Sequence, residues 1–185
     1  MVNGFLRNQF LVAMPNMVGD EFDRSVTLLA EHNPDGAMGL VINRPTDLTL
    51  HDMLTHMGIE HEGVSREYPV FWGGPVQPER GFVLHRPAGN WDASLELGDD
   101  LAITTSKDIL EALGRGEGPS EYLVTLGYAG WGGGQLEDEI RQNSWLNTPT
   151  DAEIIFLTPT AERWSAAARL IGLDPSRLSG HAGHA

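Results

Sequence analysis

Short apolar segments alternate with turn residues along the first part of the chain, a pattern typical of β-strands. One apolar run covers residues 9–14 and ends at Pro15. Two more runs, residues 26–32 and 37–43, are separated by residues 33–36, Asn-Pro-Asp-Gly. That tetrapeptide suits a type I turn, with Pro at the second position and Gly at the fourth. The pattern therefore predicts one strand followed by a hairpin.

Helical spacing of apolar residues appears four times further along the chain. The first helix is expected to begin after Thr49, because Thr49 and Asp52 have capping-box spacing, with Asp in place of Glu. Gly58 is expected to end it. The other helices are expected to begin at Ser106, at Gly134 and near Thr160.

The remaining apolar runs predict further strands. These are residues 70–72, 81–85, 101–104, 122–128 and 153–157. The sequence contains no repeat, low-complexity tract or linker, so residues 1–185 are expected to form a single domain. The mixture of strands and helices predicts the α+β class.

The base of the predicted hairpin carries two arginines. If the turn closes the hairpin, paired residue numbers sum to about 69, and Ser25 lies opposite Arg44. Arg24 and Arg44 then gather at the end remote from the turn. In one interpretation a nearby carboxylate neutralises them, from Asp20, Glu21 or Asp23. In the other, Arg24, Ser25, Asn43 and Arg44 bind a small anion, a phosphate or a carboxylate, by bidentate hydrogen bonds.

Two further segments carry candidate chemistry. Glu31 and His32 resemble an acid–base pair, but adjacent strand residues point to opposite faces, so we expect one buried and one exposed. Residues 127–140 follow a strand–glycine loop–helix order that suits phosphates. The spacing does not fit a dinucleotide fingerprint, however, and acidic residues crowd the start of the helix. A tight turn that packs Trp131 is the favoured interpretation, while Gln135 and Glu137 beside Tyr128 leave a polar pocket open.

Several short segments of the chain, taken together, form a family fingerprint. They are residues 14–17 (Met-Pro-Asn-Met), 22–26 (Phe-Asp-Arg-Ser-Val), 31–32 (Glu-His), 39–45 (Gly-Leu-Val-Ile-Asn-Arg-Pro), 72–76 (Trp-Gly-Gly-Pro-Val), 127–131 (Gly-Tyr-Ala-Gly-Trp), 134–137 (Gly-Gln-Leu-Glu) and 143–146 (Asn-Ser-Trp-Leu). In this order, and over nearly the whole chain, they resemble the AlgH/YqgE family of small bacterial proteins.

The resemblance implies a partly barrel-like, mixed β-sheet flanked by helices and a role as a transcriptional regulator, without an established biochemical activity. It also marks positions whose role is open. They are Glu31, His32, Pro45, Gly73, Gly74, Tyr128, Gly130, Trp131, Gln135 and Glu137.

The charge balance restricts the partners. Twelve Lys and Arg against 26 Asp and Glu give a formal net charge of −14, and Lys107 is the only lysine. Because nucleic-acid affinity rests on cations that neutralise phosphates, direct DNA binding is not expected. Any regulatory role should therefore act through a protein partner or a small ligand. The anion site at Arg24 and Arg44 is the alternative function.

Other classes of site lack their sequence patterns. The chain has no cysteine, and the spacing of His51, His56 and His61 does not place them on one helix face, so no metal or cofactor is expected. A nucleophile elbow is absent, which favours a non-enzymatic role. There is no run of 18 apolar residues and no signal-peptide pattern, so a cytoplasmic protein without a membrane span is expected.

Overall fold

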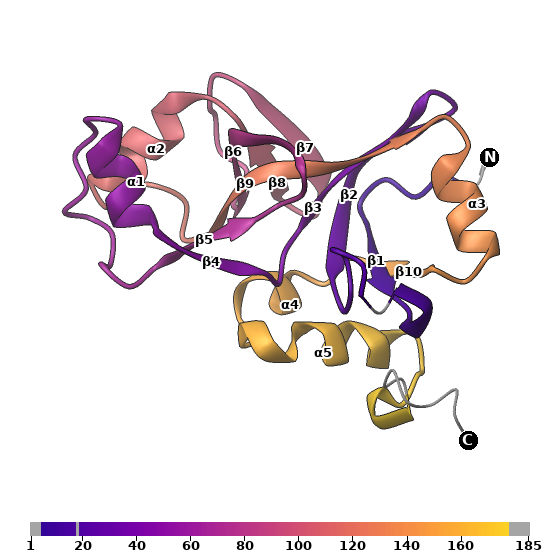
Figure 1. The fold of residues 1–185 in the computed structure, drawn as a ribbon. Coiled ribbons are helices and arrows are strands. Elements are labelled where there is room, and N and C mark those ends of the chain that lie inside the picture. Colours follow the sequence, from indigo (N-terminus) through magenta and orange to yellow (C-terminus); the bar gives the residue numbers. More distant parts are fainter. Residues whose placement is uncertain (1–4, 18, 178–185) are drawn as a thin grey trace.

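The computed structural model describes residues 5–17 and 19–177, and Figure 1 shows their arrangement. Its strands are β1 (Gln9–Ala13), β2 (Val26–Asn33), β3 (Gly36–Val41), β4 (Pro45–Thr49), β5 (Pro69–Trp72), β6 (Val76–Arg86), β7 (Ser94–Gly98), β8 (Leu101–Thr104), β9 (Glu121–Gly132) and β10 (Trp145–Pro149). Its helices are α1 (Leu50–His56), α2 (Lys107–Gly114), α3 (Gln135–Arg141), α4 (Ala152–Phe156) and α5 (Arg163–Leu170), with short 3-10 turns η1 (Pro15–Met17), η2 (Thr160–Glu162) and η3 (Pro175–Arg177).

Within the described residues the ten strands form one curled sheet, with the order β10-β1-β2-β3-β9-β6-β8-β7. Neighbours along this path are antiparallel. A side branch makes the sheet mixed, because β5 runs parallel to β9 and pairs antiparallel with β4. The long strand β9 joins the two halves, pairing with β3 near its end and with β6 over the rest. The predicted α+β class and the mixed, partly barrel-like sheet are confirmed.

The β2–β3 hairpin has the predicted register only near its turn. Asn33 lies opposite Gly36 as expected, but an irregularity between Leu29 and Glu31 shifts the remaining pairs by one residue. Such a bulge places one extra residue on one strand and changes which side chains share a face. Ala30 and Glu31 consequently both line the inner side of the curl, although they are adjacent.

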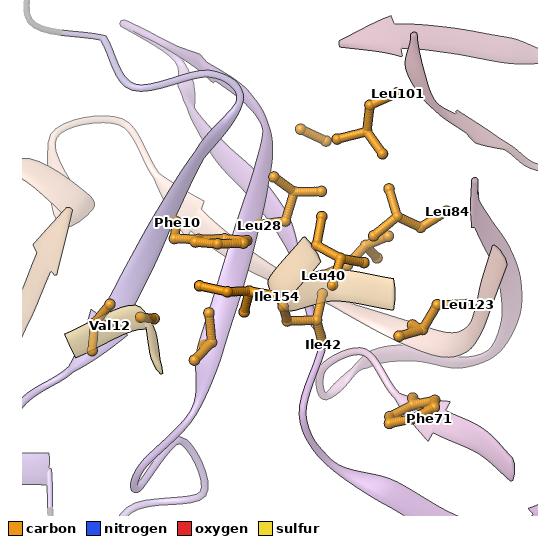
Figure 2. Close-up of a cluster of buried hydrophobic side chains, with 14 of the residues drawn as sticks. Phe10, Val12, Leu28, Leu40, Ile42, Phe71, Leu84, Leu101, Leu123 and Ile154 are labelled. Carbon is orange, nitrogen blue, oxygen red and sulfur yellow. The ribbon is translucent and has the colours of Figure 1, made fainter. Parts of the chain in front are cut away.

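The inner face of the curled sheet holds the largest group of buried apolar side chains (Figure 2). Strand residues such as Phe10, Leu28 and Leu84 meet Ile154 and Ile155 of α4 and Trp164 of α5 there. In Figure 1, α4 and α5 lie below the sheet, and the tip of the β2–β3 hairpin lies above it. The two helices therefore plug the lower end of the half-barrel.

The outer face is covered in two places. Helices α1 and α2 pack on β5, β6 and β9 through Leu54, Ile109 and Val124. Helix α3 packs on the other half through Leu136, beside Trp131 and Trp145. Among the described helices none is long and apolar enough to cross a membrane.

Local signals placed most helices correctly. Thr49 caps α1, since its side chain accepts a hydrogen bond from the Asp52 N–H at 3.0 Å, and Gly58 follows the helix with φ +71°. The strand predicted at residues 153–157 is wrong, because these residues form α4. Asp151 caps that helix, and the adjacent Ile154 and Ile155 are both buried, which one face of a strand would not allow.

Candidate functional site

The upper end of the half-barrel is open. A cleft of about 880 Å³ lies on the inner face, and no residue of α4 or α5 lines it. Its apolar lining comes from strands far apart in the sequence: Met38, Val76, Phe82, Leu95, Ile103 and Tyr128. Ligand sites are typically concave, mostly apolar and 300–1,000 Å³ in volume, so this cleft has the size and character of a binding site.

Charged side chains stand at the rim of the cleft. Glu31 and Asp35 line it from the hairpin side and are exposed. Arg80 lines it from β6, with its guanidinium carbon 5.3 Å from the centre of the Phe82 ring. Within the described residues, none of the three takes part in an ion pair. The rim therefore offers both signs of charge to a bound molecule.

Gly130 forms a bare part of the cleft lining on β9. A Cβ atom built there would meet only the Tyr128 ring at 3.6 Å and Val76 at 3.8 Å, which are ordinary contacts. Its backbone is not in the left-handed region either, so a Cβ atom adds no backbone strain there. Gly130 is thus a position at which the cleft can be filled while the strand is kept.

Asn43 organises the base of the hairpin. Its side chain accepts a hydrogen bond from the Val26 N–H and donates one to the Arg24 carbonyl, both at 2.9 Å. Ser25 is fully buried between these groups. The Arg24 backbone has φ +57°, a left-handed conformation that is uncommon for a residue other than glycine. These bonds hold that conformation, so Asn43 serves the local fold.

The two arginines at this base do not share a partner. The Arg44 guanidinium donates to the main-chain carbonyls of Glu21 and Asp23, and it lies 5.3 Å from the centre of the Trp72 ring. The Arg24 guanidinium is 4.1 Å from the Trp164 ring centre and is exposed. Neither forms an ion pair with a carboxylate in the part of the chain that is described.

Glu31 and His32 have separate environments, as the strand geometry predicts. His32 is buried, and its Nδ1 accepts a hydrogen bond from the Leu6 N–H at 2.9 Å. Its Nε2 lies 3.2 Å from a Glu137 carboxylate oxygen, an ion-pair distance without hydrogen-bond alignment. The acid that meets His32 is thus on α3, and the neighbouring Glu31 faces the cleft.

The glycines after Trp72 allow close crossing of two chain segments. A Cβ on Gly73 would lie 2.4 Å from the Gly127 carbonyl oxygen, and one on Gly74 would lie 2.1 Å from the Tyr128 carbonyl carbon. Gly73 also donates to the Leu126 carbonyl and accepts from the Val41 N–H. This crossing joins β3, β5 and β9, and Pro45 begins the nearby β4.

The predicted glycine loop is mostly strand. β9 continues through Gly130 to Gly132, and the turn to α3 is short. Trp131 is buried, as the packing interpretation predicts, and its indole N–H donates to Glu139 at 3.0 Å. Glu139 also accepts from the Trp145 indole at 2.9 Å and from Gln135 at 2.9 Å. Gln135 takes part in these contacts, whereas Glu137 meets His32, and neither residue lines the cleft beside Tyr128.

A buried histidine lies on β6, beside β8. His85 bonds through Nε2 to Thr104 at 2.7 Å, and its Nδ1 lies 3.0 Å from the Pro87 carbonyl oxygen. Burial lowers the pKa of His85, because the charged form loses its hydration. A neutral ring with its proton on Nδ1 fits both contacts.

A contact between two further histidines was not predicted from the sequence. Gly58 reverses the chain after α1, which brings the rings of His51 and His61 to 4.2 Å between centres.

Known proteins are similar to this chain in sequence and fold. A family model described as AlgH-like matches residues 10–176. The chain belongs to the AlgH-like family. A UPF0301 protein of Thioalkalivibrio sulfidiphilus is 57% identical over 178 residues, which cover 96% of each chain. A UPF0301 protein of Nitrosococcus oceani is 54% identical over 98% of this chain and 97% of its own.

Two solved structures are similar to this AlgH-like chain. The solution structure of the AlgH protein from Pseudomonas aeruginosa has a TM-score of 0.79 and 44% identity, and covers 100% of this chain and 98% of its own. Protein DIP2367 from Corynebacterium diphtheriae has a TM-score of 0.71 at 21% identity, and covers 91% of this chain and 88% of its own, a likeness of fold alone. The AlgH/YqgE resemblance is thereby confirmed.

Sequence reasoning found part of the cleft of this AlgH-like chain. The motif positions Glu31, Tyr128, Gly130 and Trp131 line it. The hairpin base, the glycine crossing after Trp72 and the outer-face contacts contain the other motif positions. Arg80, Phe82 and the opposite wall on β7 and β8 were missed, because only the curl of the sheet brings them to the hairpin.

Proposed function

We propose that the protein is a non-catalytic binding protein that acts through the cleft in the half-barrel. The observation that carries the proposal is an apolar concave surface left open at one end of an otherwise filled inner face. A partner molecule contacts the apolar floor around Phe82 and Tyr128 and is oriented by the rim charges. Such a division between apolar contact and a few polar anchors is typical of binding sites.

Regulation of transcription by this protein then passes through the bound molecule and not through contact with DNA. Most arginines in the described residues are already engaged: Arg86, Arg115, Arg141 and Arg177 pair with carboxylates, and Arg7, Arg44 and Arg163 donate to carbonyls. With a net charge of −14, the surface supports no phosphate-binding stripe. Fluorescence anisotropy with duplex DNA at low salt should show no binding, and saturable binding would contradict this part.

The test of the cleft uses a matched pair of glycines. Gly130→Leu fills the cleft, whereas Gly132→Leu places the same side chain two residues along β9, at a glycine that does not line the cleft and has open space around it. Thermal denaturation against a library of metabolites and peptides is the measurement. A ligand at 100 times its Kd should stabilise the wild type by about 2.7 kcal/mol. Stabilisation should disappear in Gly130→Leu and persist in Gly132→Leu; ligands that stabilise both variants equally would refute the cleft.

A small-anion site at the hairpin base is the second candidate function. The observation in its favour is that the exposed Arg24 guanidinium has no carboxylate partner among the described residues. Arg44 and Asn43 act there by holding the backbone around Arg24. Inorganic phosphate and simple phosphate esters should then raise the melting temperature of the wild type and leave that of Arg24→Gln unchanged. An equal effect on both proteins would eliminate this site.

A further inference from the structure

One edge of the sheet remains open beside the cleft. Strand β7 is the last strand of the order, and in the described part of the chain it pairs with β8 alone. Ala93, Ser94 and Leu95 line the cleft on this side. An edge strand presents main-chain N–H and C=O groups that an added strand can pair with. The cleft is therefore bordered by a strand edge that can pair with another strand.

The register shows which residues of β7 direct their main-chain N–H and C=O groups away from β8. The Thr105 N–H donates to the Ala93 carbonyl at 2.9 Å, and these residues stand directly opposite each other in the register that pairs Ser94 with Thr104. In an antiparallel ladder, hydrogen-bonded and non-hydrogen-bonded pairs alternate. Ser94 and Glu96 consequently direct their main-chain groups away from β8, toward the open edge.

A side chain from the segment just before β1 confirms the direction of this edge. The Arg7 guanidinium donates to the main-chain carbonyl of Glu96. That contact occupies one acceptor and protects one end of the edge. The N–H and C=O of Ser94, which lie nearer the cleft, have no such cover among the described residues.

The opposite wall of the cleft is also formed by strand residues. Strand β1 pairs with β2 only from Val26 to Leu28, so beyond the bulge β2 has β3 as its one strand partner in the described residues. Ala30, Glu31 and Asn33 of this stretch line the cleft. The cleft thus lies between two stretches of strand, above an apolar floor. An extended chain with an apolar side chain at every second position matches this arrangement.

The rim selects the charge of such a chain. Glu31 and Asp35 line the cleft from the hairpin side. Arg80 is the only basic residue of the described lining, and it lies over Phe82. The balance at the rim is negative, as it is over the whole chain. Complementary charge favours encounter with a basic partner.

We propose that the cleft binds an extended, basic segment of a partner protein, which adds to β7 as a strand through Ser94 and buries alternate apolar side chains on the floor. This rests on the proposed function of the cleft and names its partner class. Strand addition obtains affinity from main-chain hydrogen bonds and specificity from pockets for alternate side chains.

The test starts from the full chain and a displayed library of random peptides of strand length. Selected peptides should alternate apolar residues with Lys or Arg, and glutamate-for-lysine versions should bind more weakly. Binding should slow amide hydrogen exchange at Ser94. N-methylation should abolish binding only at alternate peptide positions, namely those whose N–H groups face β7.

Two substitutions test the same point on the protein. Ser94→Pro removes the outward N–H without removing a ladder bond to β8, because Pro is tolerated on an edge strand at such a position. Ser94→Ala removes the bond between the Ser94 and Thr104 hydroxyls and keeps the N–H. Peptide affinity should fall about tenfold in Ser94→Pro and stay unchanged in Ser94→Ala. If Ser94→Pro fails to fold, the N-methylated peptides decide the question on the wild-type protein.

The outcomes separate this inference from the function it rests on. Peptides that tolerate N-methylation everywhere, or leave exchange at Ser94 unchanged, overturn strand addition; loss of their binding in Gly130→Leu would still support the cleft. If no peptide is selected but a small molecule stabilises the wild type and not Gly130→Leu, the partner class is wrong and the cleft stands. If nothing binds in a way that depends on Gly130, both fail.

Discussion

The two ends of the half-barrel use the same inner face in opposite ways. At the lower end, α4 and α5 insert Ile155 and Trp164, which are almost completely buried against strand residues. At the upper end no described helix covers the face, and Phe82 and Tyr128 form the floor of the cleft. The curl of the sheet is common to both ends. The difference shows that the position of the helices determines where core ends and binding surface begins.

Polar groups follow the same division. At the plugged end the Arg163 guanidinium donates to the carbonyls of Ile42 and Thr158, and the Trp164 indole donates to the Ala13 carbonyl at 2.9 Å. At the open end the Arg80 guanidinium lies over the Phe82 ring without an ion pair among the described residues, and Ser94 directs its main-chain groups outward. Satisfied polar groups fix a core, whereas unsatisfied ones at a surface leave bonds for a partner.

The largest loss of stability should come from Trp164→Ala at the plugged end. Removing a buried aromatic side chain from the plug leaves a cavity and an unpaired Ala13 carbonyl, at a cost of about 3–5 kcal/mol in the free energy of unfolding. Met38→Ala at the open end should cost about 1 kcal/mol, because that side chain is only half-buried. Urea unfolding of both variants measures the difference; equal losses would mean that the two ends are equally part of the core.

A smaller loss of stability is expected from Glu139→Ala, on the outer face of the sheet. Glu139 accepts hydrogen bonds from two buried indoles, Trp131 and Trp145, and both donors would lose their partner. A loss of about 2–3 kcal/mol is expected. Glu139→Gln keeps one acceptor oxygen and should lose less. Urea unfolding is again the measurement, and a neutral Glu139→Ala would show that these bonds do not support the wall of the cleft.

Arg163→Met tests the polar contacts of the plug without changing its length much. The two carbonyls that Arg163 serves would be left without a donor, which should cost about 1–3 kcal/mol. Burial lowers the pKa of Arg163, so part of the loss is offset by removal of a poorly hydrated charge. Chemical denaturation should show the loss. A more stable Arg163→Met would mean that packing alone holds α5.

The smallest effect concerns pH. The pKa of His85 is lowered from its ordinary value of 6.5 by burial, so the unfolded chain binds this proton more readily than the folded one. The His85 contribution is therefore fully present above pH 6.5 and is lost as the pH falls below it. The slope of unfolding free energy against pH below 6.5 should be smaller in His85→Gln than in the wild type. An identical slope in His85→Gln would contradict the assignment.

Sequence patterns predicted the elements whose causes are local. Thr49, Asp52 and Gly58 specify the beginning and end of α1 by themselves, and the Asn-Pro-Asp-Gly turn specifies the hairpin. The sequence patterns failed where tertiary contacts determine the secondary structure. The Ile154–Ile155 pair has strand propensity, but its burial in the plug and the Asp151 cap make it a helix.

The candidate site was predictable only in part for the same reason. Motif positions such as Glu31, Tyr128 and Gly130 pointed to the hairpin and to β9, yet nothing in the sequence linked them to Phe82 or Leu95. That link requires the bulge after Leu29 and the curl of the sheet. The arginines at the hairpin base attracted attention because their charge is visible in the sequence, whereas an apolar floor is indistinguishable from core until its cover is known.

The position of β9 in both sequence and sheet has a consequence for synthesis of the chain. β9 is the neighbour of both β3 and β6, and it enters only at Glu121. Until the ribosome has released that segment, the hairpin and the β6–β8–β7 half have no strand to join them, and their inner edges stay exposed. Assembly of the sheet is therefore a late, long-range event in the life of the nascent protein, the kind that makes folding slow and dependent on chaperone protection.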